Sequence, residues 1–336
     1  MRNIVQASII TTFRCNAKCH MCHIWKHPTQ PSEELKPKYL DKLPDGLRIN
    51  ITGGEPMLRK DIEEIFEILY PKAHLLELST NGYFTDKIVA LAEKYPKTLI
   101  RVSVEGLPKL NDSLRGIPNG FDRALKTILE LKKTRCKNIG FSIVICDKNV
   151  DDLLKLYELC TYLDVELANS VTHNSWYFHK FDNVDEDREK TVQKEKEFIA
   201  ALLRSRRKGI RGKLKDYGRA YFNKSIVRRL GGDTSNYRPP CGAGADFFFV
   251  DPWGNIIPCN GSREKWVIGN LKEATYEEIL HSEKAKEIMK RVKTCEEYCC
   301  FVVTERHDMV RRPWRPLYWI AKNKLRLTLN LTADLE

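Results

Sequence analysis

The chain has 336 residues, of which 42% are hydrophobic and 30% are charged, and its formal net charge at pH 7 is +12. A chain of this length and composition can bury a hydrophobic core, which excludes disorder as its ordinary state. No run approaches the about 18 apolar residues that a membrane-spanning helix needs, so we expect a soluble protein. The first residues are too few and too polar for a signal peptide, which predicts a cytoplasmic location.

The positive charge is concentrated in two stretches of the chain. Residues 204–238 hold twelve basic and two acidic residues, and residues 311–331 hold six basic residues and no acid. Such an excess suits a nucleic acid, an anionic lipid or a phosphorylated substrate, and it is equally typical of a solvated lysine-rich surface. Its location places it outside the amino-terminal half of the chain.

Six short apolar, β-branched runs alternate with helical patterns in the first half of the chain. Apolar residues three and four apart within residues 61–69 and 121–131 predict two of the helices. Strands that alternate with helices predict parallel βα units, and six of them make a partial, TIM-like (β/α)6 barrel of the α/β class. Active groups should then lie at the carboxyl ends of the strands. The strands are predicted at residues 4–10, 47–52, 75–80, 99–104, 139–145 and 163–168.

The pattern changes after this core of residues 1–170. We expect a helical and basic linker region over residues 171–240, with a long helix at 184–208. The aromatic stretch 173–179 lies near its beginning. The aromatic rings of this stretch either line a substrate site or pack on the long helix. Residues 241–310 predict a small irregular module with a strand at 247–250, a second strand and short helices around 276–292. The tail, residues 311–336, is basic and aromatic, and alternation over residues 324–331 predicts a strand.

The chain has eleven cysteines, too many for an ordinary cytosolic protein of this size, and an odd number does not make a complete disulfide framework. Metal binding is the natural interpretation. Cys136, Cys146 and Cys160 stand alone in apolar stretches and are interpreted as small buried hydrophobic residues.

Cys15, Cys19 and Cys22 form a C-x3-C-x2-C motif directly after the first predicted strand. Three closely spaced thiolates can hold three irons of a cubane cluster and leave the fourth iron open to a substrate or cosubstrate. A structural zinc site would need a fourth ligand, which His20 or His23 could supply. The motif alone favours the cluster and leaves zinc open.

The ends of the later strands carry a matching series of motifs. The second strand ends in Gly-Gly-Glu-Pro at 53–56, the third in Ser-Thr-Asn-Gly at 79–82, and the fourth in Val-Ser-Val-Glu-Gly at 102–106, followed by Asn-Asp-Ser-Leu-Arg-Gly at 111–116. With the cysteine motif, this ordered set resembles the radical S-adenosylmethionine (SAM) superfamily over about residues 4–170. The resemblance implies a SAM-binding 4Fe-4S cluster on Cys15, Cys19 and Cys22.

The resemblance also implies a SAM-binding role for eight residues. The two glycines would let the backbone approach the methionine moiety, and Glu55 would accept hydrogen bonds from its ammonium group. Ser103 would lie near the ribose and Arg115 near the carboxylate. Without a role in SAM binding, the glycines would form a turn, Ser79 or Asn81 would cap a helix, and Arg115 would form a surface ion pair. The expected cofactor-binding residues are Met21, Gly53, Gly54, Glu55, Pro56, Asn81, Ser103 and Arg115.

Two residues depart from the pattern of the superfamily. Met21 stands before the third cysteine, where the superfamily commonly has an aromatic residue near the adenine, and a flexible methionine can fill that space. Glu105 stands where Asp is common, so the resemblance does not assign it a contact with the ribose. Neither departure removes a cluster ligand.

The late cysteines resemble the SPASM/twitch modules that carry auxiliary iron-sulfur clusters in one branch of the superfamily. Two complete four-cysteine clusters would need eight thiolates, whereas the module has five, so we expect one auxiliary 4Fe-4S cluster. Zinc bound by four thiolates is the alternative. The expected ligands are Cys241, Cys259 and two of the three residues Cys295, Cys299 and Cys300.

The resemblance implies that an external electron donor such as flavodoxin or ferredoxin reduces the first cluster. It also implies that SAM is then cleaved to a 5′-deoxyadenosyl radical, and that this radical takes a hydrogen atom from the substrate. Many SPASM enzymes that modify peptides have an amino-terminal recognition domain, whereas only 14 residues precede Cys15. We therefore expect a small, anionic substrate such as a sugar, cyclitol, nucleotide or lipid-linked sugar, which would be oxidised, epimerised or rearranged.

Other functions are also compatible with the sequence. A peptide could be presented by a separate carrier protein, and two clusters could serve a non-catalytic electron carrier, although the SAM motifs argue against the latter. An RNA-modifying enzyme is a weaker alternative because the chain has no separate RNA-binding signature, so a nucleic-acid partner is not expected. Trp314, Leu317, Tyr318 and Trp319 with their basic neighbours suit weak peripheral membrane association, but packing of the tail on the barrel is the favoured interpretation.

Overall fold

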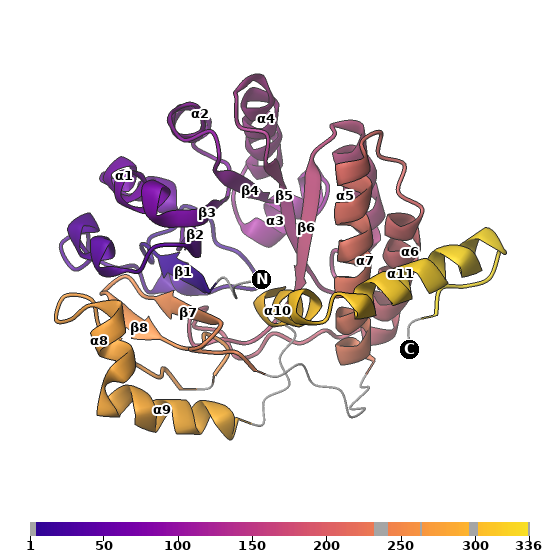
Figure 1. Ribbon diagram of the computed structural model, residues 1–336. Helices are drawn as coiled ribbons and strands as arrows, with labels where there is room; N and C mark the ends of the chain where they lie inside the picture. The colour runs from indigo at the N-terminus through magenta and orange to yellow at the C-terminus, as the bar shows by residue number, and fades with distance from the viewer. Residues whose placement is uncertain (1–4, 232–240, 263, 296–301, 335–336) are drawn as a thin grey trace.

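The computed structural model (Figure 1) describes residues 5–231, 241–262, 264–295 and 302–334. One nine-stranded sheet runs through it in the order β6-β5-β4-β3-β2-β1-β7-β8-β9. Strands β1 to β6 pair in parallel from neighbour to neighbour. This arrangement confirms the predicted α/β class and the partial barrel. The six parallel strands are β1 Gln6–Ile10, β2 Leu47–Thr52, β3 Ala73–Thr80, β4 Leu99–Ser103, β5 Ile139–Ile145 and β6 Glu166–Val171.

The outer layer consists of the helices that connect these strands (Figure 1). Their apolar faces pack on the sheet around fully buried residues such as Ile49, Ile51 and Phe141. The sixth strand begins three residues later than predicted because Asp164, with φ 53°, belongs to the turn after the preceding helix. The helices are α1 Ile62–Lys72, α2 Thr85–Lys94, α3 Pro108–Arg115, α4 Gly120–Lys133 and α5 Leu153–Tyr162, with short 3-10 turns at Ile24–Lys26, Pro37–Lys42, Pro56–Leu58 and Val150–Asp152.

The region expected to be helical and basic contains two long helices. After α6 (Arg188–Leu203), α7 spans Ile210–Leu230 and packs along both α6 and β6. It buries apolar residues, including Ile226, together with Asp216 and Asn223. Two of its cations, Lys215 and Arg219, pair with Glu166 of β6. The helix predicted at 184–208 is thus found as α6, and the basic residues that follow it form a second helix.

The cysteine-rich carboxyl-terminal module continues the sheet of the half-barrel. Its first strand, β7 (Phe247–Val250), pairs in parallel with β1, and β8 (Asn255–Ile257) and β9 (Gly269–Asn270) add antiparallel strands. Helices α8 (Tyr276–His281) and α9 (Glu283–Lys293) follow. The expected strands and short helices are thus confirmed, and the shared sheet fixes the module against the strand that leads into Cys15.

The end of the tail is helical, so the predicted strand at 324–331 is wrong. Helix α10 spans Val302–Arg311 and α11 spans Trp314–Thr328. In α11 the residues Trp319, Asn323 and Leu327, four apart, are buried against α6 and α7, and this helical spacing decides the structure over the local alternation. Packing of the tail is confirmed, although Trp314, Leu317 and Tyr318 remain exposed on its other face.

No helix in the described ranges is long and apolar enough to cross a membrane. Three cysteines outside the two clusters are buried in the core, as expected, with relative exposures of 0%, 7% and 0%. They are Cys136, Cys146 and Cys160.

A buried acid in α6 makes the stability of the fold dependent on pH. Glu195 is fully buried, and neither carboxylate oxygen has a hydrogen-bond partner within the described residues. Burial raises its pKa from 4.5 to about 8. Between these values the folded state holds a proton that the unfolded state lacks, so stability falls as pH rises from 4.5 to 8.

Replacing this acid should therefore stabilise the protein at alkaline pH. From pH 6 to pH 8 the wild type is expected to lose about 2 kcal/mol through this group, a loss that Glu195→Met avoids. Urea unfolding at the two pH values measures the difference. Glu158→Met, at an exposed position of α5, is the matched control and should follow the wild type. An identical pH dependence in wild type and Glu195→Met would show that Glu195 titrates normally.

Candidate active site

The first cysteine motif lies in an irregular loop directly after β1. Cys15, Cys19 and Cys22 are partly buried and are free thiols. The N–H groups of Lys18 and His20 donate to the carbonyls of Arg115 (2.9 Å) and Leu114 (2.7 Å), the last residues of α3. The loop therefore satisfies carbonyl groups that a helix end leaves open, and α3 holds the three cysteines in place.

The thiols of this loop sit in a poorly solvated environment. Burial raises the pKa of Cys15 and of Cys22 to about 12, and it also raises the pKa of Cys19. The negative charges of neighbouring thiolates add to the effect at Cys15 and Cys22. Metal binding at such a site must displace protons from the thiols, so loading is coupled to pH.

The arrangement of the loop suits a cluster better than a single ion. Within the described residues, which include His20 and His23, no three His, Cys, Asp or Glu side chains come close enough together to hold one metal ion. A closed zinc site needs four converging ligands, whereas a cubane cluster spreads its three thiolates over three irons. The three free, partly buried thiols on one anchored loop fit the cluster.

Gly53 and Gly54 lie against the backbone of the cysteine loop. A Cβ atom on Gly54 would be 2.2 Å from the carbonyl oxygen of Arg14, and one on Gly53 would be 2.7 Å from that of Thr12. The N–H of Gly54 donates to the Thr12 carbonyl at 2.7 Å, and the next N–H donates to Arg14 at 2.8 Å. The glycines therefore permit close packing between the β2 end and the cysteine loop.

Glu55 is fully buried and joins the ends of β2 and β3. Its carboxylate accepts hydrogen bonds from the Thr80 hydroxyl (2.7 Å) and from the backbone N–H groups of Asn81 (2.7 Å) and Met57 (3.1 Å). Burial raises its pKa, although these hydrogen bonds act in the opposite direction. Its expected contact with the ammonium group of SAM stays a prediction, and so does the role of Pro56, which begins the turn Pro56–Leu58.

Arg115 forms a buried ion pair and not the surface pair considered above. Its guanidinium donates to Glu105 at 2.9 Å, and the other carboxylate oxygen of Glu105 accepts from the N–H of Val144 at 2.8 Å. Burial raises the pKa of Glu105 to about 7, with Arg115 opposing the shift. Glu105 thus orients the guanidinium that the resemblance assigns to the SAM carboxylate, a role that stays a prediction.

The other three expected SAM residues also surround the strand ends. The Asn81 side chain donates to Asn16 in the cysteine loop at 2.7 Å, a contact that a helix cap would not need. Met21 is buried, and Ser103 lies with Ser142 on the cavity wall, their hydroxyl oxygens 3.4 Å apart. The structure therefore brings all of the first motif's residues to one edge of the sheet.

A buried carboxylate beneath the cysteine loop escaped the sequence analysis. Glu34, 2% exposed at its side chain, accepts hydrogen bonds from Arg14 (2.8 and 3.0 Å), Thr29 (2.7 Å) and Thr12, and it lies 3.5 Å from Arg59. Although burial alone would raise its pKa, these partners hold the pKa below 4.5. The partners are far apart in sequence, and no motif marks them.

In the second cysteine region, Cys241 precedes β7, Cys259 follows β8, and Cys295 follows α9. Burial raises the pKa of Cys259 to about 11, and negative charge on Cys241 and Cys295 raises it further, so the three lie within electrostatic reach of one another. Cys241 and Cys295 are exposed. Cys299 and Cys300 lie outside the described residues, and the choice among the last three cysteines stays open.

The aromatic stretch lies between the two cysteine regions and does not pack on α6. The indole N–H of Trp176 donates to the carbonyl of Cys259 at 3.2 Å, and the hydroxyl of Tyr177 donates to the carbonyl of Gly53 at 2.9 Å. Both rings cluster with Phe13 of the cysteine loop. They form an apolar wall that connects the module to the half-barrel.

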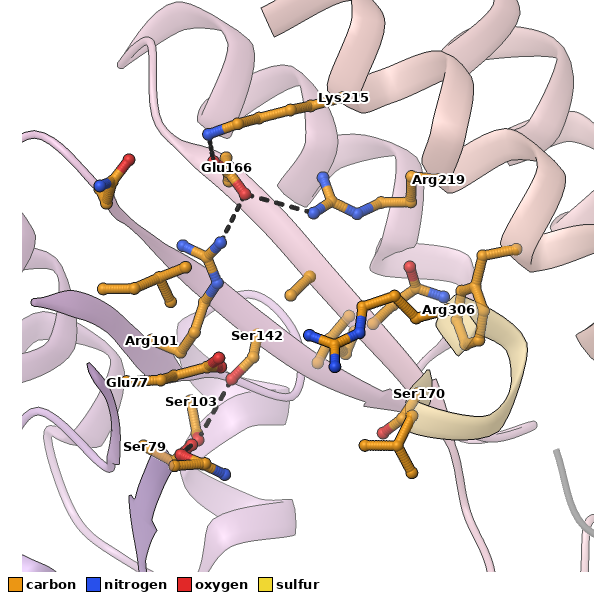
Figure 2. A pocket seen from close by; sticks show the side chains of 18 of the residues that line it. Glu77, Ser79, Arg101, Ser103, Ser142, Glu166, Ser170, Lys215, Arg219 and Arg306 are labelled. Carbon is orange, nitrogen blue, oxygen red and sulfur yellow. Dashed lines mark hydrogen bonds and ion pairs between the residues drawn. The ribbon is translucent and has the colours of Figure 1, made fainter. Parts of the chain in front are cut away.

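A cavity of about 850 Å³ lies on the inner face of the half-barrel (Figure 2). Strands β1 to β6 form its wall, and α7 and α10 contribute side chains on the side that the open sheet leaves uncovered. Ser79, Ser103 and Glu105 from the strand-end motifs lie on the wall, which places the cavity next to the expected SAM site. Such a size is typical of small-molecule sites.

Two family matches agree with this geometry. Residues 9–160 match the radical SAM superfamily, and residues 241–301 match the SPASM iron-sulfur cluster-binding domain. The native anSMEcpe structure with bound AdoMet and Cp18Cys peptide has a TM-score of 0.62 at 18% identity, covering 94% of this chain and 99% of that chain. At this identity the likeness shows the fold alone.

Curated relatives resemble the chain over different lengths. The Fe-coproporphyrin III synthase of Methanosarcina barkeri is 30% identical over 155 residues, or 44% of this chain and 39% of that protein. The mycofactocin maturase MftC of Mycolicibacterium smegmatis is 25% identical over 290 residues, or 82% of this chain and 70% of that protein. The chain thus spans less than half the length of the first relative and more than two thirds of the second.

Proposed function

Because the chain belongs to the radical SAM superfamily and carries a SPASM iron-sulfur module, we propose that it transfers a hydrogen atom from a small anionic substrate, held in the half-barrel cavity, to the 5′-deoxyadenosyl group of SAM. Its cofactors are a SAM-binding 4Fe-4S cluster, SAM and an auxiliary iron-sulfur cluster. The net reaction is an oxidation, an epimerisation or a rearrangement of the substrate.

Cys15, Cys19 and Cys22 would hold the first cluster. When bound, the cluster supplies the electron that cleaves SAM to methionine and a 5′-deoxyadenosyl radical, after reduction by an external donor such as flavodoxin or ferredoxin. The chain's own contribution is positional: α3 and the β2 end hold the cysteine loop, and Glu105 orients Arg115 toward the same site. The apolar wall of Trp176 and Tyr177 keeps water from this side of the site.

The observation that carries the proposal is the cavity beside these residues. Its volume of about 850 Å³ fits a molecule of metabolite size. Ser103 and Glu105 form part of its wall, so a substrate inside it would lie next to bound SAM. Basic side chains from β2, β4, α7 and α10 also reach into it, which supports an anionic substrate over a neutral one (Figure 2).

The SAM chemistry can be tested without knowing the substrate. Anaerobically reconstituted enzyme with dithionite and SAM is expected to release 5′-deoxyadenosine, and the combined Cys15→Ala, Cys19→Ala and Cys22→Ala variant should release none, because no thiolates remain to hold the cluster. Chromatography of the quenched reaction measures the product. Cys136→Ala, which alters a buried cysteine distant from both motifs, is the matched control. Equal release by the triple variant would contradict the assignment.

Metal analysis tests the auxiliary cluster in the same samples. About eight iron atoms per chain support two cubane clusters, whereas about four with one zinc would reject the auxiliary cluster. We propose Cys241, Cys259 and two of Cys295, Cys299 and Cys300 as its ligands. Incubation with deuterated metabolite pools, followed by a search for deuterium in 5′-deoxyadenosine, would then identify the substrate class.

A peptide-modifying enzyme is the second candidate. It is supported by the mycofactocin maturase, whose sequence matches 82% of this chain. The similar anSMEcpe structure, which contains a bound peptide, supports it as well. Deuterium transfer from a labelled peptide, and none from small anionic metabolites, would favour it. Modification of RNA has less support, because Lys215 and Arg219 of the basic segment line the cavity.

A further inference from the structure

A layer of charged side chains crosses the cavity below the expected SAM site. Arg101 on β4 and Glu166 on β6 lie on either side of Gly140 on β5, in register with it, and their ion pair of 2.5 Å spans the strand between them. Since Gly140 has no side chain, nothing on β5 separates the pair. Arg101 precedes Ser103 by two residues, so this layer lies about 6.6 Å deeper in the barrel.

This layer contains more cations than anions (Figure 2). Glu166 accepts from three of them, Arg101, Lys215 and Arg219. Although burial alone would raise it, these cations hold the pKa of Glu166 at about 2, so its single negative charge persists at neutral pH.

The opposite wall adds two further arginines. Arg48 pairs with Glu77 at 2.7 Å, and Arg306 on α10 points into the cavity without a hydrogen bond or ion pair to any described residue. Burial lowers the pKa of Arg306 to about 10, which leaves it charged at pH 7. Five cations thus face two carboxylates, and the remaining acid of the wall, Glu105, is already paired with Arg115 outside this group.

Several guanidinium groups of this layer have unused donors. Nη1 of Arg101, Nη1 of Arg219 and Nε of Arg48 are buried and have no hydrogen-bond partner within the described residues. The side chain of Arg101 is only 8% exposed and that of Arg219 only 14%. A buried charged donor without an acceptor is costly, which indicates that an acceptor belongs there.

We propose that the anionic group of the substrate, a phosphate or a carboxylate, binds Arg101, Arg219 and Arg306 at this layer, with the reacting C–H bond above it near Ser103. Planar guanidinium groups suit both anions because they donate two parallel hydrogen bonds. This inference rests on the proposed function, because only that function makes the bound molecule a substrate. It also fixes the substrate's orientation, with its charge toward the amino-terminal ends of the strands.

Calorimetric titration of the reconstituted holoenzyme with inorganic phosphate and, separately, with succinate tests the site at constant ionic strength. We expect Arg306→Gln to weaken binding of the preferred anion about tenfold, since it removes one charged donor. Arg306 has no partner to lose among the described residues, so the variant should fold normally. Arg306→Lys should restore part of the affinity because it keeps the charge without the planar pair of donors.

Arg211→Gln is the matched control, because Arg211 lies on α7 two turns before Arg219 and is exposed. It should bind like the wild type. Tighter phosphate binding would identify a phosphate ester as the substrate class, and tighter succinate binding a carboxylate. The inference is overturned if neither anion binds the wild type, if Arg306→Gln binds like the wild type, or if Arg211→Gln loses as much affinity.

The same samples separate this inference from the proposed function. Release of 5′-deoxyadenosine by the wild type without bound substrate depends on the cysteine loop, so it tests the proposed function independently of anion binding. If the wild type releases 5′-deoxyadenosine but binds neither anion, the inference alone is overturned. Anion binding without any release would overturn the proposed function and leave an anion-binding cavity.

Discussion

Gly54→Ala is expected to prevent loading of the first cluster while the auxiliary cluster stays loaded. The added Cβ would lie 2.2 Å from the carbonyl oxygen and 2.7 Å from the carbonyl carbon of Arg14, and 3.0 Å from the Cβ of Cys15. These are backbone atoms and the Cβ of Cys15, a proposed cluster ligand, so no rotamer change can relieve the clash. The loop must move, and Cys15 moves with it.

The size of the effect follows from the geometry that the cluster needs. Iron content should fall from about eight to about four atoms per chain. Release of 5′-deoxyadenosine should fall at least about 100-fold, because a shift of about 1 Å at a reacting centre already costs that much. Metal analysis, the visible absorbance of the clusters and the product assay measure these three quantities.

Gly209→Ala is the control for this prediction, since a Cβ on Gly209 would meet nothing within 4 Å and its φ of −88° suits any residue. It should keep its iron and its activity. If Gly54→Ala also kept about eight iron atoms and lost only affinity for SAM, the glycine would serve the methionine moiety, as the resemblance implies, and not the packing of the cysteine loop.

The apolar runs of the sequence predicted the half-barrel well, because each buried strand needs its own run of apolar residues. Five of the six expected strands end within two residues of the observed ones, and the sixth is displaced only by the turn at Asp164. The motifs sit at strand ends, and parallel strands bring their carboxyl ends to one edge. The placement of Cys15, Glu55 and Ser103 near one another could therefore be predicted from the sequence.

The errors have a different origin, since they depend on partners distant in sequence. The tail alternates over 324–331 and also carries Trp319, Asn323 and Leu327 at helical spacing, and only contact with α6 and α7 decides between the two patterns. The charged layer of the cavity was equally hidden. Arg101 and Glu166 lie on strands that are not adjacent, and they are in contact because Gly140 on the strand between them has no side chain. No local pattern in the sequence predicts this contact.

Glu34→Gln is expected to destabilise the protein by about 3–5 kcal/mol, the cost of breaking a buried charged pair by removing one partner. The carboxylate accepts from Arg14 and both threonines, and a carboxamide has only one oxygen to replace its two. The amide nitrogen would instead face a guanidinium or a hydroxyl. Arg59, 4% exposed at its side chain and 3.5 Å from Glu34, would lose a neighbouring negative charge as well.

The consequence for function follows from where this network lies. Thr12 and Arg14 belong to the segment that carries Cys15, and their carbonyls bind the N–H groups of Gly54 and Glu55. Loosening Glu34 should therefore speed the loss of iron to a chelator in addition to lowering the urea midpoint. Glu63, whose side chain is 60% exposed, pairs with Lys94 on the surface. Glu63→Gln should therefore lower the free energy of unfolding by less than about 1 kcal/mol and leave the rate of iron loss unchanged. Equal effects of the two substitutions would show that the buried network does not support the cluster loop.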